Sequence, residues 1–210
     1  SHWGWDIGAR TVSRELVRAT HSDGVMATYS RLVVDANRMR GHDQFIRRTV
    51  EGWQLTFNRG LEDEEIQRRV DLYHEPYHKA VDAQLRQRLE KDGDVILLSV
   101  HSFTPAYFGE LRHMDIGVLY QPYEAVALRL AGELKVEGFN VALNEPYSAS
   151  DGLTYSADRH GENHKVVYLE LEINQLLIDT PAKARVLARR VADALMRMQV
   201  RSKTRDSETR

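Results

Sequence analysis

The sequence contains no cysteine, and this absence excludes several kinds of protein and site. A disulfide scaffold, a thiolate nucleophile and a Cys-ligated zinc or iron–sulfur site are impossible. Any metal bound by this chain must therefore take His, Asp or Glu as ligands.

Net charge and long hydrophobic runs are also scarce. The 29 Lys and Arg residues nearly balance 31 Asp and Glu, so the formal net charge is -2 and gives no global reason to bind nucleic acid or an anionic membrane. The longest apolar run, residues 95–100, is far below the roughly 20 residues that cross a bilayer, and no signal-peptide pattern opens the sequence. These absences predict a soluble, cytoplasmic protein with neither a nucleic-acid nor a membrane partner.

Nothing in the sequence marks a domain boundary. There is no internal repeat, low-complexity tract or Pro/Gly-rich linker, and a 42% hydrophobic content is ordinary for a globular protein, so residues 1–210 are expected to form one domain. A Walker loop, a dinucleotide fingerprint, a nucleophile elbow and a calcium loop are all absent, which argues against nucleotide and serine-hydrolase chemistry.

Helical and strand patterns alternate along the chain. They predict a helix over residues 6–19, a strand ending in residues 30–35 and a long helical segment over 66–89 that Pro76 kinks or splits. They continue with a buried central strand at 94–100, a helix at 124–137, a short strand near Val141, a loop over 144–158, a strand at 166–173, a final helix and a flexible tail at 201–210. This order predicts an α/β fold of three layers, with helices on both faces of a mixed, mainly parallel sheet.

Polar residues at strand ends are the first candidates for chemistry, because ligands of open α/β sheets gather there. His101 directly follows an apolar strand and can reach a metal or a substrate, although a partly buried, hydrogen-bonded histidine is the simpler interpretation. Glu170 and Glu172 alternate onto one face of a later strand, where a carboxylate is costly unless it is solvated, paired or functional.

A second candidate group surrounds the end of the predicted strand at 30–35. Arg31, Asn37 and Arg38 suit the recognition of an amino-acid carboxylate, and surface ion pairs are the alternative. His74 and His78 have a spacing that can bind metal, but no suitable acid lies between them, so a packing or surface role is favoured.

Six segments together resemble the N-formylglutamate amidohydrolase family, a branch of the zinc-carboxypeptidase-like hydrolases. Each is weak alone, whereas their common order is specific: HWGWDIGA at 2–9, SRLVVDANR at 30–38, YHEPYH at 73–78, HSFTP at 101–105, NEPYS at 144–148 and EINQ at 172–175. The resemblance implies a zinc-carboxypeptidase-like (phosphorylase/hydrolase-like) fold. It also implies a hydrolase of amino-acid metabolism that cleaves an N-acyl amino acid, with N-formyl-L-glutamate giving formate and L-glutamate.

The resemblance further implies a metal centre. His101 and Asp6 would be ligands of one zinc ion, although capping of the first helix is the simpler role for Asp6. Glu172 would be the general base that activates the metal-bound water and passes its proton to the leaving amine. Zinc would lower the pKa of that water toward about 7.

The substrate would be a small acylated amino acid. By the same resemblance, Asn37 and Arg38 would hold its carboxylate, and Arg31 or Arg112 would polarise the scissile carbonyl. Tyr155 and the loop from Asn144 to Tyr147 would close over the substrate.

The sequence departs from the family at its beginning. Family members start with a strand ending in a Cys-Glu-His-like segment that supplies a further metal ligand. We expect that strand to lie upstream of the given sequence. The alternative is that another histidine supplies the ligand, and His2 is the nearest candidate. Asn174 stands where the family often has Arg. A carboxypeptidase-like or other acylamino-acid hydrolase, and a catalytically dead carboxylate-binding member, are therefore the alternatives.

Overall fold

A four-stranded sheet forms the middle layer of the protein, in the order β3-β8-β6-β7. The structure is a computed structural model that describes residues 2–92, 95–107, 109–147 and 153–207. β3 pairs with β8 and β6 with β7 in parallel, whereas β6 and β8 are antiparallel, so the sheet is mixed. The strands are β3 (Ile96–Phe103), β6 (Ile116–Leu119), β7 (Val141–Leu143) and β8 (Val167–Asn174).

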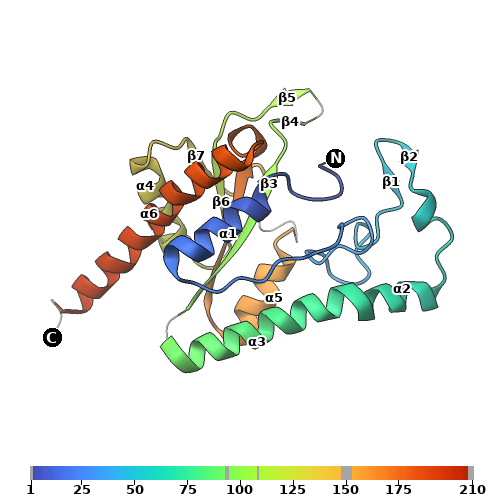
Figure 1. The fold of residues 1–210 in the computed structure, drawn as a ribbon, viewed down its shortest axis with the longest axis horizontal. Helices are drawn as coiled ribbons and strands as arrows, with labels where there is room; N and C mark the ends of the chain where they lie inside the picture. The colour runs from blue at the N-terminus through green and yellow to red at the C-terminus, as the bar shows by residue number, and fades with distance from the viewer. Residues whose placement is uncertain (1, 93–94, 108, 148–152, 208–210) are drawn as a thin grey trace.

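Helices cover both faces of this sheet (Figure 1), which confirms the predicted α/β layering. One face carries α1 (Ala9–Thr20), α4 (Glu124–Val136) and α6 (Pro181–Ser207), and the other carries α3 (Glu75–Asp92) and α5 (Tyr155–His164). The shorter elements are β1 (Thr49–Val50), β2 (Trp53–Gln54), η1 (Thr56–Asn58), α2 (Asp63–Arg69), η2 (Val70–His74), β4 (Ala106–Tyr107), β5 (Glu110–Leu111) and η4 (Gln175–Leu177). No helix in the described part of the chain is both long and apolar enough to cross a membrane.

Alternation along β8 decides which residues face which layer. Leu169, Leu171 and Ile173 are buried in the core that α1, α4 and α6 share. Tyr168 faces α5, and its ring would lie 1.9 Å from a Cβ at position 161, so only glycine lets the helix approach this closely. The residues at even-numbered positions of β8, like Tyr168, therefore lie on the α5 side of the sheet.

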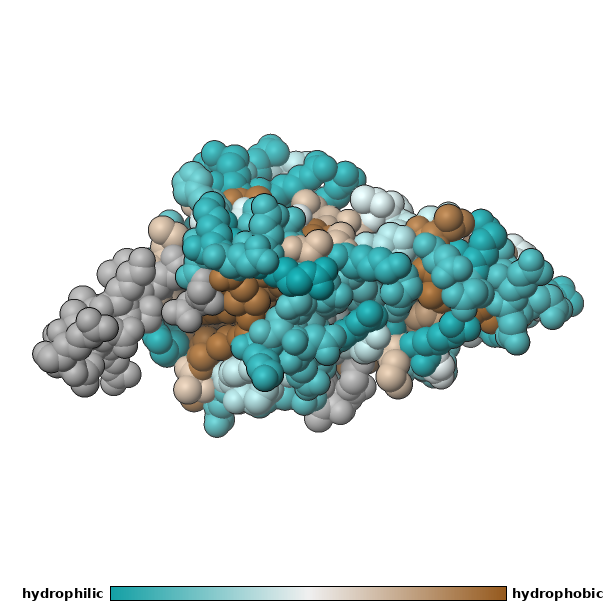
Figure 2. Space-filling view, turned by 90° about the horizontal axis from the view of Figure 1, so that it is seen from below, coloured by the Kyte–Doolittle hydropathy of each residue, from teal (hydrophilic) through white to brown (hydrophobic). Residues whose placement is uncertain are grey.

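The long helical pattern divides immediately before Pro76. The π-helical turn η2 separates α2 from α3, and Pro76 is the second residue of α3, so the predicted interruption is confirmed. In Figure 1 the two helices form one long edge of the molecule, and Figure 2, seen from that side, shows a mainly hydrophilic surface. Val81 and Leu85 bury the opposite side of α3 against Val166.

The prediction of a strand ending in residues 30–35 is wrong. The segment is a succession of turns whose backbone groups find partners outside any sheet: Arg31 N–H donates to the Gly4 carbonyl, and Asn58 donates to the Leu32 carbonyl. Arg69 donates to the carbonyl of Val33. Hydrogen bonds from distant backbone groups and side chains thus satisfy the backbone that a strand would have satisfied by a ladder.

Three other sequence expectations need correction. The apolar strand at 94–100 corresponds to β3, which is covered on both faces but lies at the edge of the described sheet, with Ile96 48% exposed. The loop expected over 144–158 gives way to α5 at Tyr155. Helix α6 extends to Ser207, so the backbone at 201–207 is helical; flexibility of that tail stays a prediction, and residues 208–210 lie outside the described part.

Candidate active site

His101 lies near the carboxyl end of β3, where its imidazole is close to two acidic side chains and one amide. Its Nδ1 is 2.6 Å from Asp6 Oδ2, and its Nε2 is 3.6 Å from Glu170 Oε2. The Nδ2 atom of Asn37 lies 3.4 Å from the same Nε2. Burial opposes protonation of this ring, but Glu170 and Asp6 outweigh it and raise the pKa of His101 to about 10.

Asp6 binds across the site and does not cap a helix. Helix α1 begins at Ala9 without a side-chain cap, after Gly8 in the left-handed region with φ at 80°. A Cβ at Gly8 would lie 2.3 Å from the Ile178 carbonyl oxygen, which fixes this turn tightly. The Asp6 carboxylate instead binds His101 and Arg31, and these partners overcome burial to hold the pKa of Asp6 below its ordinary value.

Glu170 and Glu172 lie side by side on the α5 side of β8, as the sequence alternation predicted. Glu172 is opposite His101 in the parallel register, and the two carboxyl groups are only 2% and 6% exposed as residues. One oxygen of each is buried without a hydrogen-bond partner. Burial raises the pKa of both carboxyl groups, and the charge of His101 only partly opposes this.

The donor atoms around His101 fit a divalent metal ion chemically. An imidazole nitrogen and two carboxyl groups with unpartnered buried oxygens are the ligand types that zinc takes in the absence of cysteine. The 3.6 Å between His101 Nε2 and Glu170 Oε2 is close to the separation of about 3.4 Å expected for two ligands of one tetrahedral zinc. Asp6 contacts the other ring nitrogen, a position from which it orients the imidazole.

Asn37 and Arg38 reach this region but already have backbone partners. The Asn37 amide donates to the Leu153 carbonyl at 2.7 Å and accepts from the Ser156 N–H at 2.8 Å. Arg38 also donates to the Leu153 carbonyl, at 3.1 Å, and is buried. Both side chains therefore hold the segment that enters α5 against His101.

Two cationic side chains lie near Asp6 and Tyr147. Arg31 is one-third exposed as a side chain and pairs with Asp6. Arg112 stacks over the ring of Tyr147 at 5.0 Å and donates to its hydroxyl at 3.2 Å. Burial raises the pKa of Tyr147, and the nearby charge of Glu172 adds to the shift while Arg112 opposes it. Tyr147 belongs to the loop at 144–147 that the resemblance places over the substrate, and that role stays a prediction.

Asn144 and Tyr155 have partners within the protein, and their proposed role over the substrate stays a prediction. Asn144 accepts from the Tyr120 N–H at 2.9 Å and so closes the end of β6. Tyr155 stacks near His74 with 6.3 Å between ring centroids, and its hydroxyl accepts from Arg159 at 3.2 Å. Neither side chain has a contact with His101 or Glu172 among the interactions described for these residues.

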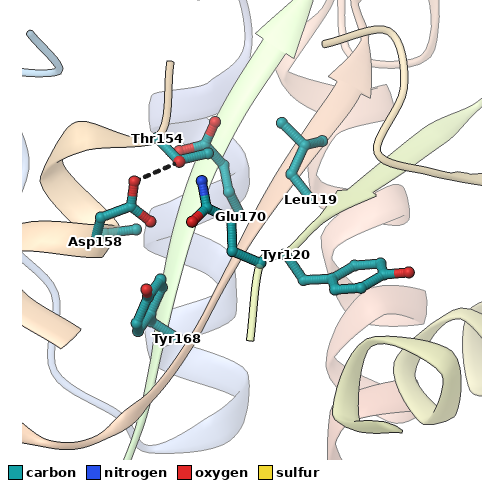
Figure 3. Close-up of a pocket in the computed structure, with 8 residues that line it drawn as sticks. Leu119, Tyr120, Thr154, Asp158, Tyr168 and Glu170 are labelled. Carbon is teal, nitrogen blue, oxygen red and sulfur yellow. Dashed lines mark hydrogen bonds between the residues drawn. The ribbon is translucent and has the colours of Figure 1, made fainter. Parts of the chain in front are cut away.

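A small pocket adjoins Glu170 (Figure 3). Thr154 donates to Asp158 across it at 2.7 Å, and burial raises the pKa of Asp158. The pocket has no room for a substrate. Its lining side chains include Leu119, Tyr120, Thr154, Asp158, Tyr168 and Glu170.

A row of buried histidines lies behind the site, between α3 and α5. His74 and His78 pack inside the protein, which confirms the packing role favoured for them, and His78 lies 2.8 Å from His160. Beyond it, Asp82, His160 and His164 bring one ligand atom each to within 4.8 Å of one another. The four-residue spacing of His160 and His164 is the sequence signal that could have found this group.

Comparison with known proteins decides the family. A sequence model described as N-formylglutamate amidohydrolase matches residues 1–178. The chain belongs to the N-formylglutamate amidohydrolase family. The match covers all six segments that carry the resemblance, and membership in this family indicates an amidohydrolase acting on a small molecule.

Solved structures share the fold. The gene product Atu2144 from Agrobacterium tumefaciens is 27% identical with a TM-score of 0.87, over 95% of this chain and 81% of that one. The N-formylglutamate amidohydrolase from Ralstonia eutropha JMP134 is 19% identical with a TM-score of 0.67, over 90% of this chain and 82% of that one. Among curated proteins, none matches the sequence.

Proposed function

We propose that this chain is a metal-dependent amidohydrolase that cleaves N-formyl-L-glutamate, or a closely similar N-acyl amino acid, into a carboxylic acid and an amino acid. The observation that carries the proposal is the buried Glu172 carboxyl opposite His101, with one oxygen lacking a hydrogen-bond partner. A carboxyl group that burial keeps near its protonation midpoint at neutral pH is suited to general acid–base chemistry.

Glu172 would carry the proton through the reaction. Its carboxylate accepts a proton from the attacking water, whose oxygen forms the new bond to the acyl carbon. The carboxylic acid then donates that proton to the amide nitrogen as the carbon–nitrogen bond breaks. One water is consumed for each amide, and Glu172 returns to its starting form.

His101 and Glu170 would hold the metal, for which we propose zinc. When bound, zinc lowers the pKa of water and stabilises negative charge on the acyl oxygen. Asp6 keeps the His101 ring in position through Nδ1, a contact that also sets which nitrogen faces Glu170. Asp6 is thus proposed as a positioning residue instead of the direct ligand that the resemblance implies.

The charged side chains would select an acidic substrate. Arg112 donates to Tyr147, and the charge of Arg31 is felt at both Tyr147 and Glu172. Guanidinium groups bind carboxylates through paired hydrogen bonds. Arg112 also lines an open groove of about 490 Å³. We propose these two arginines for the substrate carboxylates, with Asn37 and Arg38 holding the Leu153–Ser156 backbone in place.

The deciding experiment compares Glu172→Gln with the wild-type chain in an assay of formate release from N-formyl-L-glutamate. We expect kcat to fall by about 10²–10⁴-fold, because glutamine cannot take the proton, while glutamate binding and the circular dichroism spectrum are retained. The matched control is Glu110→Gln, which changes an exposed residue of β5 and should leave kcat unchanged.

Full activity of Glu172→Gln would overturn the assignment of the base. The substrate range is tested in the same assay with N-acetyl-glutamate and a dipeptide. A wild-type chain that hydrolyses the dipeptide faster than the formyl compound would favour the carboxypeptidase-like alternative. Tight glutamate binding with no turnover of any of the three would favour the catalytically inactive one.

A further inference from the structure

A second group of metal-ligand side chains lies between α3 and α5, apart from the His101 cluster. Asp82 Oδ1 is 2.9 Å from His160 Nδ1 and 2.8 Å from His164 Nε2. His160 and His164 are one turn apart on α5 and so face the same way, whereas Asp82 comes from α3. Within the described ranges, these are the residues that bring three ligand atoms to within 4.8 Å of one another.

The kinds of side chain in this group suit a metal. Two imidazoles and one carboxylate are a common ligand set for zinc.

Two of the three side chains in this group are partly exposed to solvent. The His160 side chain is fully buried, whereas 12% of His164 and 24% of Asp82 are exposed. An ion can therefore enter from solvent, and a water molecule can complete a tetrahedral set beside the three side chains.

A row of buried histidines supports His160 on the side away from Asp82. A histidine that binds metal through one nitrogen needs a hydrogen-bond partner for the other, and His78 Nδ1 lies 2.8 Å from His160 Nε2. His78 is in turn 3.2 Å from His74, which lies 3.3 Å from the carbonyl of Arg38. This buried row fixes the orientation of the His160 ring before any ion arrives.

We propose that Asp82, His160 and His164 bind a divalent transition-metal ion of the zinc class, at a structural site that fastens α5 to α3. The fastening matters for the active site because the first turn of α5 provides the Ser156 N–H that holds Asn37 beside His101. The ion is separate from the one proposed at His101 and takes no part in the reaction.

The test is a zinc titration of chelator-treated protein, followed by elemental mass spectrometry after dialysis and by thermal unfolding. The variants Asp82→Asn and His164→Gln change partly exposed ligands, and His113→Gln is the matched control at an exposed histidine. We expect wild-type and His113→Gln protein to gain about 5–10 °C in Tm at zinc 100-fold above Kd. Asp82→Asn and His164→Gln should each bind one zinc fewer and lose that gain.

The variant His101→Gln separates this site from the proposed catalytic one. It should keep the zinc bound at Asp82 and the associated rise in Tm, whatever becomes of activity. Equal zinc content and an equal Tm gain in both ligand variants and the control would overturn the proposal, as would loss of all zinc from His101→Gln. Failure of the proposed reaction would leave the Asp82-dependent zinc untouched, so the two failures can be told apart.

Discussion

Replacing Arg69 by Met should destabilise the segment that carries Arg31 and Asn37. The Arg69 side chain is buried, and its guanidinium donates to the carbonyls of Val33 at 3.0 Å and Phe57 at 2.8 Å and to Asn58 Oδ1 at 2.6 Å. Methionine retains much of the volume but donates no hydrogen bond. These three acceptors would then be left without this donor.

The size of the effect follows from the loss of this buried donor. Each buried acceptor left unsatisfied costs about 1–3 kcal/mol, and breaking a buried charged network costs roughly 3–5 kcal/mol in total. For a domain of this size each kcal/mol lowers Tm by about 2–4 °C, so we expect a fall of about 6–20 °C in thermal unfolding followed by circular dichroism. Activity should fall as well, because the same turns place Arg31 and Asn37 in the site.

Arg68→Met is the matched control. Arg68 is adjacent and has the same chemistry, but its partner is Glu65 at the surface, so its loss should change Tm little. Equal Tm values for Arg68→Met and Arg69→Met would refute the idea that buried donors hold the turns of residues 30–38.

Two further perturbations test the packing of helices. Gly161→Ala should lower the free energy of unfolding in urea by about 1–3 kcal/mol, because the new methyl would meet Tyr168. Gly132 has open space around it, so Gly132→Ala should raise the same free energy by about 0.4–1 kcal/mol. A stabilised Gly161→Ala variant would contradict the packing of α5. Hydrogen bonds from Arg18 and Arg189 lower the pKa of Glu15 to about 2 from an ordinary value of 4.5, so its stabilisation is present above pH 4.5 and is lost as the pH falls toward 2. The difference in urea midpoint between wild type and Glu15→Gln should therefore shrink from pH 7 to pH 3, and a constant difference would count against the α1–α6 ion pair.

Strong periodicity made much of the fold predictable. The helix expected at 124–137 is α4, and the strand expected at 166–173 is β8 to within one residue. Helix α5 escaped prediction because its buried residues are Ser156, Ala157, His160 and Gly161, which are small or polar and give no apolar stripe. The position of α5 is set by its contact with Tyr168 on β8, and a pattern within the helix sequence alone does not predict such a contact.

The site was predictable where a strand end supplies the residue. His101 and Glu172 meet across the β3–β8 register, and the face shared by Glu170 and Glu172 follows from alternation alone. The contacts of Asp6 with His101 span 95 residues of sequence, and here the family resemblance indicated the neighbourhood. Which residue binds directly and which one orients depends on the ring nitrogen that each contacts, and no sequence spacing encodes that choice.

The carboxyl pair on β8 shows where this chain departs from the rules of its own fold. A strand covered on both faces ordinarily carries apolar side chains, and here two buried acids replace them on the α5 side. His101 compensates this charge only in part, because one oxygen of each acid keeps no hydrogen-bond partner. A buried acid that the fold does not satisfy costs stability. On the function proposed above, a bound cation would supply the missing positive charge beside this acid, and the reaction would use its proton.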